Sequence, residues 1–217
     1  HPAELTFGQL AEKARLDCKF RSLYVVASNL TAQRPEVFSA ETSADMPIWK
    51  AVRMSMSIPA FFAAVRAKNR DLMVDGGVTW NYPLDLFDRA AFVTPGGRDG
   101  PEARVFNKAT LGLRVDSKQE AMAGRKNWGL PRAKISGIIS YLGALVGFMM
   151  NMANKAHLED ADWHRTLIVD SAGISATDFD LTGEEIELLI QNGRVAATEY
   201  FDWFNSKTDP LVPLNRV

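Results

Sequence analysis

The fold is decided by two stretches of sequence, SMSIPAFF at residues 55–62 and LMVDGGVTWNYP at residues 72–83. The second stretch opens with a short apolar run that predicts a strand ending at Asp75. In α/β sheets, ligand sites form outside the carboxyl ends of strands. Gly76 and Gly77 then allow a sharp turn and a close approach to another group. A carboxylate placed in this way can orient a nucleophile or act as a general base. The alternative is a plain Asp-Gly-Gly turn.

Elements on either side of these stretches alternate between short apolar runs and helical patterns. The run at residues 23–30 is almost continuously apolar, which is typical of a strand buried on both faces in a parallel sheet. Alternating strands and helices indicate a layered α/β fold. Further strands are expected at residues 110–115 and 166–169, and helices at residues 5–14, 47–56 and 183–197.

Composition excludes several classes of protein. The chain has 217 residues, of which 47% are hydrophobic and 24% are charged, so it is not a disordered chain. Its net charge of -1 argues against a dedicated nucleic-acid binder. A single cysteine, Cys18, excludes an internal disulfide and a cysteine-rich metal site. The three histidines are too far apart in sequence for a helical metal pair. These counts leave no cysteine-rich metal site and no helical histidine pair. We expect no cofactor.

The ordered set of motifs resembles the patatin-like phospholipase family. The resemblance extends over most of the chain and is much more specific than any one of its motifs. It is carried by VVASN at 25–29, SMSIP at 55–59, VDGG at 74–77 with Asn81 and Pro83, TLGLRVD at 110–116 and GISATDF at 173–179.

This resemblance implies a three-layer α/β/α fold with a mainly parallel central sheet. It also implies hydrolysis of acyl esters of phospholipids or related lipids by a Ser–Asp dyad, without a metal. In the family the Ser lies in a Gly-x-Ser-x-Gly elbow between a strand and a helix. A glycine-rich loop there supplies the N–H groups that stabilise the oxyanion. Asp75, with Gly76 and Gly77, matches the family's Asp-Gly-Gly/Ala motif.

The sequence departs from the family pattern, because no glycine-rich oxyanion loop precedes its first strand. It contains no Gly-x-Ser-x-Gly, and it begins with His1-Pro2. We therefore expect residues 1–217 to be the C-terminal portion of a single patatin-like domain, with the nucleophile-bearing N-terminal portion outside this chain and the fold incomplete. By itself the chain is expected to be inactive. The alternative is a non-catalytic patatin-type module that binds a membrane or a protein partner.

Other candidate residues are expected to have structural roles. Ser55 and Ser57 have no histidine or lysine nearby to activate them as nucleophiles. Asn81 and Pro83 are expected to shape the start of the helix after Asp75. The remaining candidates are His157 and His164 as surface or capping residues, Phe61, Phe62, Trp80 and Tyr82 as core or acyl-pocket residues, and Cys18 as a passive residue.

Residues 135–154 contain no charged side chain. The preceding segment is basic and the following one acidic. We consider a buried or half-buried helix, a helix on a membrane surface or beside a lipid-binding cleft, and a transmembrane span. Peripheral membrane contact is thus possible, and a cytoplasmic or membrane-peripheral location is favoured. The basic residues are Lys118, Arg125, Lys126, Arg132 and Lys134, against Glu120 alone.

Overall fold

The structure is a computed structural model that describes residues 4–67, 69–94, 97, 104–117, 135–157, 159–174, 178–209 and 211–216. It has a mixed α/β fold divided into two compact units. The first unit comprises His1–Pro83 and Ala133–His157, and the second comprises Leu84–Arg132 and Leu158–Val217.

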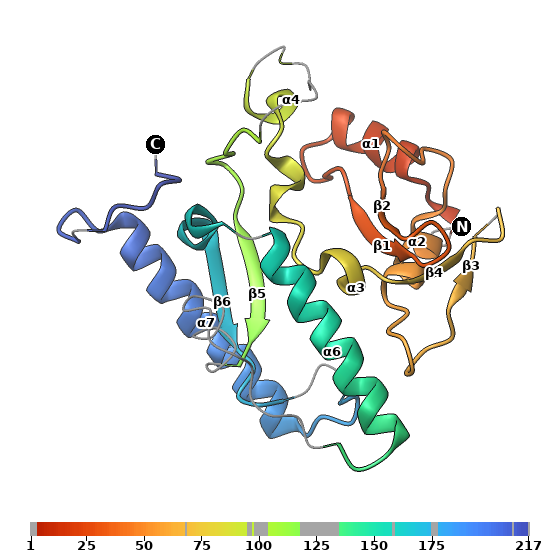
Figure 1. Ribbon diagram of the computed structural model, residues 1–217. Helices are drawn as coiled ribbons and strands as arrows, with labels where there is room; N and C mark the ends of the chain where they lie inside the picture. The colour runs from red at the N-terminus through yellow and green to blue at the C-terminus, as the bar shows by residue number, and fades with distance from the viewer. Residues whose placement is uncertain are drawn as a thin grey trace. The chain divides into compact units, whose positions relative to one another are not determined.

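The first unit is built on a four-stranded sheet with the order β2-β1-β4-β3 (Figure 1). Every neighbouring pair is antiparallel: Val25 pairs with Phe38 between β1 and β2, and Ala27 pairs with Asp75 between β1 and β4. The strands are β1 (Val25–Asn29), β2 (Arg34–Phe38), β3 (Val65–Arg66) and β4 (Leu72–Asp75).

The expectation of a mainly parallel sheet is wrong for this unit, because its sheet is antiparallel. Strand β1 is buried on both faces, as predicted. However, only residues 30–33 connect β1 to β2, and a parallel pair needs a crossover of a dozen or more residues. The burial of β1 comes instead from its central place in the sheet and from contacts with two helices of the unit.

Helices cover the sheet of the first unit. Helix α1 (Phe7–Leu16) begins with a capping box between Thr6 and Gln9, and α2 (Ile48–Ser55) follows Pro47. The four-residue helix α3 (Gly77–Trp80) begins directly after β4. The hydrophobic core of this unit consists of Phe7, Ala27, Phe38, Ala51, Met54 and Met73.

The uncharged segment forms helix α6 (Ile138–His157), which packs against α3 (Figure 1). In the described part of the chain, no helix is both long enough and apolar enough to cross a bilayer. The basic residues of 118–134 lie outside the described residues.

The second unit contains the parallel pair β5 (Gly112–Asp116) and β6 (Thr166–Asp170), in which Gly112 pairs with Thr166. Helix α7 (Gly183–Asn205) runs along β6 (Figure 1) and starts with a capping box between Thr182 and Glu185. The short helices of this unit are η2 (Leu84–Phe87), α4 (Ala90–Val93) and η3 (Asp160–Arg165).

The sequence therefore predicted most elements, though not the sheet they form. Helix α7 extends to Asn205, well beyond the expected end at residue 197. Strands β2 and β3 were not expected. The parallel arrangement is found in β5 and β6, and the three-layer arrangement stays a prediction. Residues 175–177 of the GISATDF motif lie outside the described residues.

Candidate active site

Asp75 is the last residue of β4, as the apolar run before it predicted. It pairs with Ala27 of β1, and α3 begins two residues later at Gly77. The Asp-Gly-Gly segment is thus the junction between a central strand and a helix, and not a turn between two strands.

The two stretches that decide the fold meet at this junction. The backbone N–H of Asp75 donates to the carbonyl of Ser57 over 2.9 Å, and the N–H of Gly76 donates to the carbonyl of Ser55 over 3.4 Å. The two acceptors lie at the last residue of α2 and in the segment directly after it. Because this segment hydrogen-bonds to the chain at Asp75, it fixes the direction in which β4 ends.

Gly76 is required by the close approach of the neighbouring strand. A Cβ atom at this position would lie 2.3 Å from the carbonyl oxygen of Val26 in β1. The backbone of Gly76 itself is ordinary right-handed helical, with φ -61 and ψ -30. The glycine is therefore needed for space and not for an unusual conformation.

The Asp75 carboxylate is held by one of its two oxygens. Its Oδ1 accepts a hydrogen bond of 2.7 Å from the N–H of Gly77. Among the described residues, no other group donates a hydrogen bond to this carboxylate. Burial raises the pKa of Asp75 above the usual carboxyl value, and the bond from Gly77 offsets only part of that rise. A carboxylate with one anchored oxygen, one available oxygen and a raised pKa has the properties of a general base.

Asp75 lines a hollow of about 500 Å³ within the first unit. The hollow is lined by apolar and polar groups from β1, α2 and the β4–α3 junction. Ser55, Trp80, Asn81 and Pro83 line it as well, together with Tyr24, Val25, Val26, Val52, Met56, Gly76 and Gly77.

Two hydroxyl groups that sequence reasoning missed support the junction. The Ser28 hydroxyl, which is fully buried, donates to the carbonyl of Asp75 over 2.8 Å. It also lies 2.7 Å from the hydroxyl of Thr79 in α3. Ser28 therefore joins β1, β4 and α3 at the residue that carries the carboxylate. Its only signal in the sequence was a polar residue within an apolar run.

The structure also shows where the other candidate residues from the sequence lie. The Ser57 hydroxyl is buried and donates to the carbonyl of Arg53 over 2.6 Å. Asn81 follows the end of α3, whereas the sequence placed it at a helix start. Tyr82 is buried, Phe61 is exposed, and Cys18 is exposed as a free thiol.

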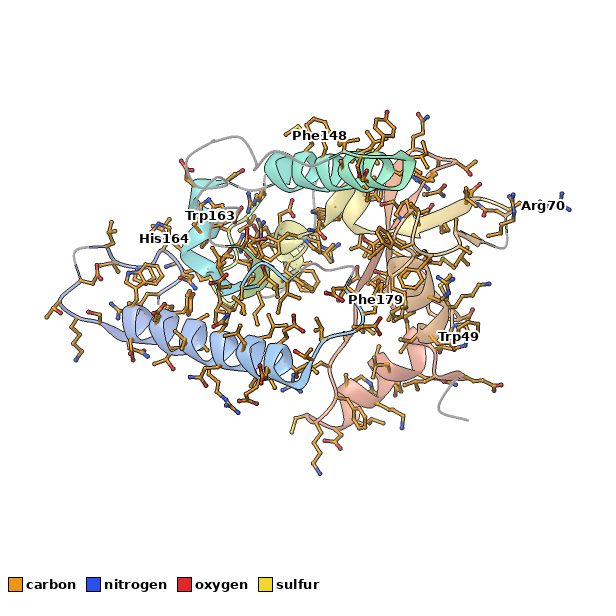
Figure 2. All side chains as sticks on the ribbon, turned by 90° about the horizontal axis from the view of Figure 1, so that it is seen from below. Trp49, Arg70, Phe148, Trp163, His164 and Phe179 are labelled. Carbon is orange, nitrogen blue, oxygen red and sulfur yellow. The ribbon has the colours of Figure 1, made fainter. Side chains whose placement is uncertain are left out.

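Of the two histidine candidates, the structure describes the side chain of His164. His164 belongs to the second unit, where its Nδ1 accepts a bond of 3.4 Å from the N–H of Leu214. Figure 2 shows it beside Trp163 in η3. The side chain of His157 lies outside the described residues. No group of three or more potential metal ligands occurs within the described ranges.

A second set of buried charges lies in the second unit. The Asp88 carboxylate accepts hydrogen bonds from Arg104 and Arg165, each over 2.6 Å, and from the N–H of Asn107. Asp162 accepts from the same two arginines and from the N–H of Glu159. The Arg165 guanidinium is fully buried and lies 4.2 Å from the ring centre of Phe106. We call Asp88, Arg104, Asp162 and Arg165 the four-charge cluster.

Comparison with known proteins gives three findings. A family model described as patatin-like phospholipase matches residues 6–88. An uncharacterized protein of Acanthamoeba polyphaga mimivirus is 46% identical over 195 residues, covering 89% of this chain and 56% of that protein. A probable lipid hydrolase of Invertebrate iridescent virus 6 is 36% identical over 82 residues, covering 38% of this chain and 26% of that protein. The chain thus spans little more than half the length of the first relative.

A solved structure also resembles the chain. VipD from Legionella pneumophila superposes with a TM-score of 0.54 at 17% identity, over 91% of this chain and 35% of that chain. At this identity the likeness concerns the fold alone.

Proposed function

The resemblance to the patatin-like phospholipases is confirmed over residues 6–88, and we propose that the complete protein is a lipid acyl hydrolase that uses a Ser–Asp dyad. The segment matched by the family model contains Asp75, Gly76 and Gly77. A probable lipid hydrolase among the relatives supports the same class of reaction. In this proposal residues 1–217 are the C-terminal portion of one catalytic domain.

The observation that carries the proposal is the state of the Asp75 carboxylate. Its Oδ1 is anchored by Gly77, its other oxygen has no donor among the described groups, and burial raises its pKa. In the proposed reaction this carboxylate takes the proton of a serine hydroxyl as the serine attacks the ester carbonyl. The acyl group passes to the serine, and the Asp75 carboxyl gives the proton to the departing alcohol. Asp75 then takes a proton from the water that attacks the acyl-serine, and this proton returns to the serine as the fatty acid leaves.

The serine belongs to a portion of the protein outside this chain. We propose that it enters the hollow at Asp75, within hydrogen-bond reach of the available oxygen. Ser55 lines the same hollow, but it is the last residue of α2 and does not lie in the strand-to-helix elbow that holds the family's serine. This chain therefore contributes the base and the surroundings of the base.

The test is hydrolysis of a nitrophenyl acyl ester by the full-length protein. Asp75→Asn keeps the size of the side chain and an acceptor for the Gly77 N–H, but removes the base. We expect kcat to fall by about 10⁴-fold, the loss seen when a serine hydrolase loses its aspartate. Asp45→Asn is the matched control, because Asp45 is exposed in the same unit, and it should leave kcat unchanged.

A fluorophosphonate probe separates the dyad from its alternatives. Labelling of the full-length wild type shows that a reactive serine is present. Activity that survives Asp75→Asn would break the assignment of the base. An absence of both labelling and hydrolysis would support the non-catalytic binding module instead.

A further inference from the structure

The second unit contains a cavity of about 580 Å³, which we call the aromatic cavity. It lies between η3, β6, α7 and the chain that follows α7. Cavities of this size are typical of small-molecule sites. Figure 2 shows Trp163 and His164 near the C-terminal end of α7. Four aromatic side chains and two carboxylates line the cavity, namely Trp163, His164, Tyr200, Trp203, Glu199 and Asp209.

Three of the aromatic side chains form a connected wall. The ring centre of Trp203 lies 5.8 Å from the ring centre of Tyr200 and 5.8 Å from that of His164. The Trp203 Nε1–H donates to the carbonyl of Leu211 over 2.9 Å. The Tyr200 hydroxyl donates to the carbonyl of His164 over 3.0 Å. Because these bonds hold the polar edges of the two rings, the rings offer a ligand mainly their π surfaces.

The charged groups of the aromatic cavity are negative. Glu199 and Asp209 line it, and no arginine or lysine occurs among the described residues that do so. Within the described ranges, the Glu199 carboxylate takes part in no hydrogen bond and no ion pair. Arg114 lies 5.8 Å from the ring centre of Trp163, but it is paired with Asp116 over 2.8 Å. The carboxylates that line the cavity therefore suit a positively charged ligand.

Aromatic rings beside carboxylates favour one kind of cation. A primary ammonium group has three N–H donors that need acceptors. The Tyr200 hydroxyl is already bonded to the carbonyl of His164 and to Nδ2 of Asn215. A quaternary ammonium group has no N–H, and it binds to ring faces through its spread positive charge. The lining of the cavity thus suits a quaternary ammonium group better than a primary one.

We propose that the aromatic cavity binds a small organic cation of the quaternary ammonium class, the group that choline carries. The rings of Tyr200 and Trp203 contact its methyl groups, and Glu199 and Asp209 balance its charge. This inference concerns binding within the second unit and does not depend on the reaction proposed for Asp75.

The first experiment is calorimetric titration of the full-length protein with choline chloride. The matched ligand is the neutral isostere of choline, in which a tert-butyl group replaces the trimethylammonium group. The two ligands have nearly the same shape and differ in charge. We expect choline to bind at least about tenfold more tightly than the isostere, because the isostere lacks the attraction to the rings and carboxylates.

Phosphocholine distinguishes two sources of the same cation. Free choline and the headgroup of a choline lipid share the trimethylammonium group, and only the headgroup carries a phosphate. Because no arginine or lysine is found among the described lining residues to meet a phosphate, we expect phosphocholine to bind more weakly than choline. Tighter binding of phosphocholine would support the same site and assign it to lipid headgroups.

Removal of the two charges tests the site itself. Glu199→Gln with Asp209→Asn keeps the size of both side chains and an acceptor for the N–H of Leu211, which Asp209 binds over 2.8 Å. The affinity for choline should fall by about tenfold or more. The matched control is Asp202→Asn, an exposed carboxylate of α7 that does not line the cavity, and it should bind like the wild type.

A pair of substitutions at Trp203 tests the aromatic wall. Trp203→Phe and Trp203→Leu both lose the bond to the carbonyl of Leu211, so they share that structural cost. Only the leucine variant loses the ring. We expect the phenylalanine variant to keep most of the affinity for choline and the leucine variant to lose about tenfold. Thermal unfolding of both variants checks that they are folded.

Three results would overturn the proposal. The first is no binding at millimolar choline, and the second is equal affinity for choline and its neutral isostere. The third is wild-type affinity in the Glu199→Gln, Asp209→Asn variant. Asp75→Asn should bind choline like the wild type, so failure at this cavity is distinguishable from failure of the proposed hydrolysis.

Discussion

Asp75 is a half-buried aspartate of the first unit and Asp88 a buried aspartate of the second, and the two carboxylates differ in their hydrogen-bond partners and in the direction of their pKa shifts. Asp75 accepts one hydrogen bond, from a backbone N–H, and burial raises its pKa. Asp88 is also subject to burial, which alone would raise its pKa. Hydrogen bonds from Arg165 and Arg104 outweigh that effect and lower the pKa of Asp88.

This contrast matches the difference expected between a carboxylate that takes part in acid–base chemistry and one that stabilises the fold. The four-charge cluster pairs two carboxylates with two guanidinium groups, and backbone N–H groups occupy further acceptor positions. Both carboxylates of the cluster are fully buried. Asp75 has an available oxygen beside a hollow, which is the arrangement expected of an acid–base residue.

The largest effect on stability should come from breaking the cluster. Arg165→Leu leaves Asp88 and Asp162 buried with one guanidinium between them. Removal of one partner from a buried ion pair costs about 3–5 kcal/mol, and we expect that loss in the free energy of unfolding measured with urea.

The matched control is Arg194→Leu in α7. Arg194 is exposed and lies 3.6 Å from Glu187, so the change should stay within about 0.5 kcal/mol. Equal losses at the two positions would show that the cluster is not a structural centre.

The next effect in size tests how the Asp75 junction is held. Gly76→Ala places a Cβ atom against the carbonyl of Val26, at 2.3 Å before any shift. Overpacking of this kind costs about 1–3 kcal/mol. Because the strain falls next to Asp75, esterase activity of the full-length protein should fall with stability.

Gly193→Ala provides the opposite case. No atom lies within 4 Å of a Cβ built at Gly193 in α7, so alanine should stabilise the helix by about 0.5–1 kcal/mol. A gain at both glycines in thermal unfolding would contradict the close approach at Gly76.

Sequence reasoning found the parts of the fold that leave a local signal. The apolar run at residues 23–30 predicted β1, and the helix expected at residues 5–14 is found as α1. The antiparallel pairing of β1 has no such signal, because it depends on the short connection at residues 30–33. Strand β2 was missed because it contains Pro35 and Glu36, which are uncommon within strands but are placed here in an edge strand.

The same distinction applies to the sites. Asp75 was singled out because it follows an apolar strand and because the ordered motifs around it resemble the patatin-like family, and its role as the base stays a prediction. Its supports are backbone bonds to Ser55 and Ser57, and backbone groups carry no sequence signal. The four-charge cluster was missed because Arg165 and Asp88 are 77 positions apart in sequence. Pairing over such a distance follows from the fold.

A smaller effect should follow from Ser28→Ala. The substitution removes the hydroxyl that joins the carbonyl of Asp75 to Thr79. We expect a loss of about 1–2 kcal/mol in the free energy of unfolding, because a buried partner is left unsatisfied. Thr198→Ala in α7 removes an exposed hydroxyl bond and should change stability less. An equal effect at both positions would show that Ser28 does not support the junction.

The smallest expected effect is the change in the free energy of unfolding caused by Asp75→Asn. The sign of this change tests the contrast between Asp75 and Asp88. A raised pKa means that the folded protein binds this proton more tightly than the unfolded chain does. The wild type should therefore lose stability as pH rises through the raised pKa of Asp75. Asparagine carries no charge and keeps an acceptor for Gly77, so the variant should be more stable than the wild type at neutral pH. The difference should vanish at acidic pH, where Asp75 is protonated in both states.

The lowered pKa values of Asp88 and Asp162 have the opposite consequence, because the stability they contribute is lost as pH falls through those values. Thermal unfolding across pH measures both slopes. An asparagine variant that is less stable than the wild type at neutral pH would show that the folded protein stabilises the Asp75 charge. The pKa of Asp75 would then be lowered, as the pKa of Asp88 is.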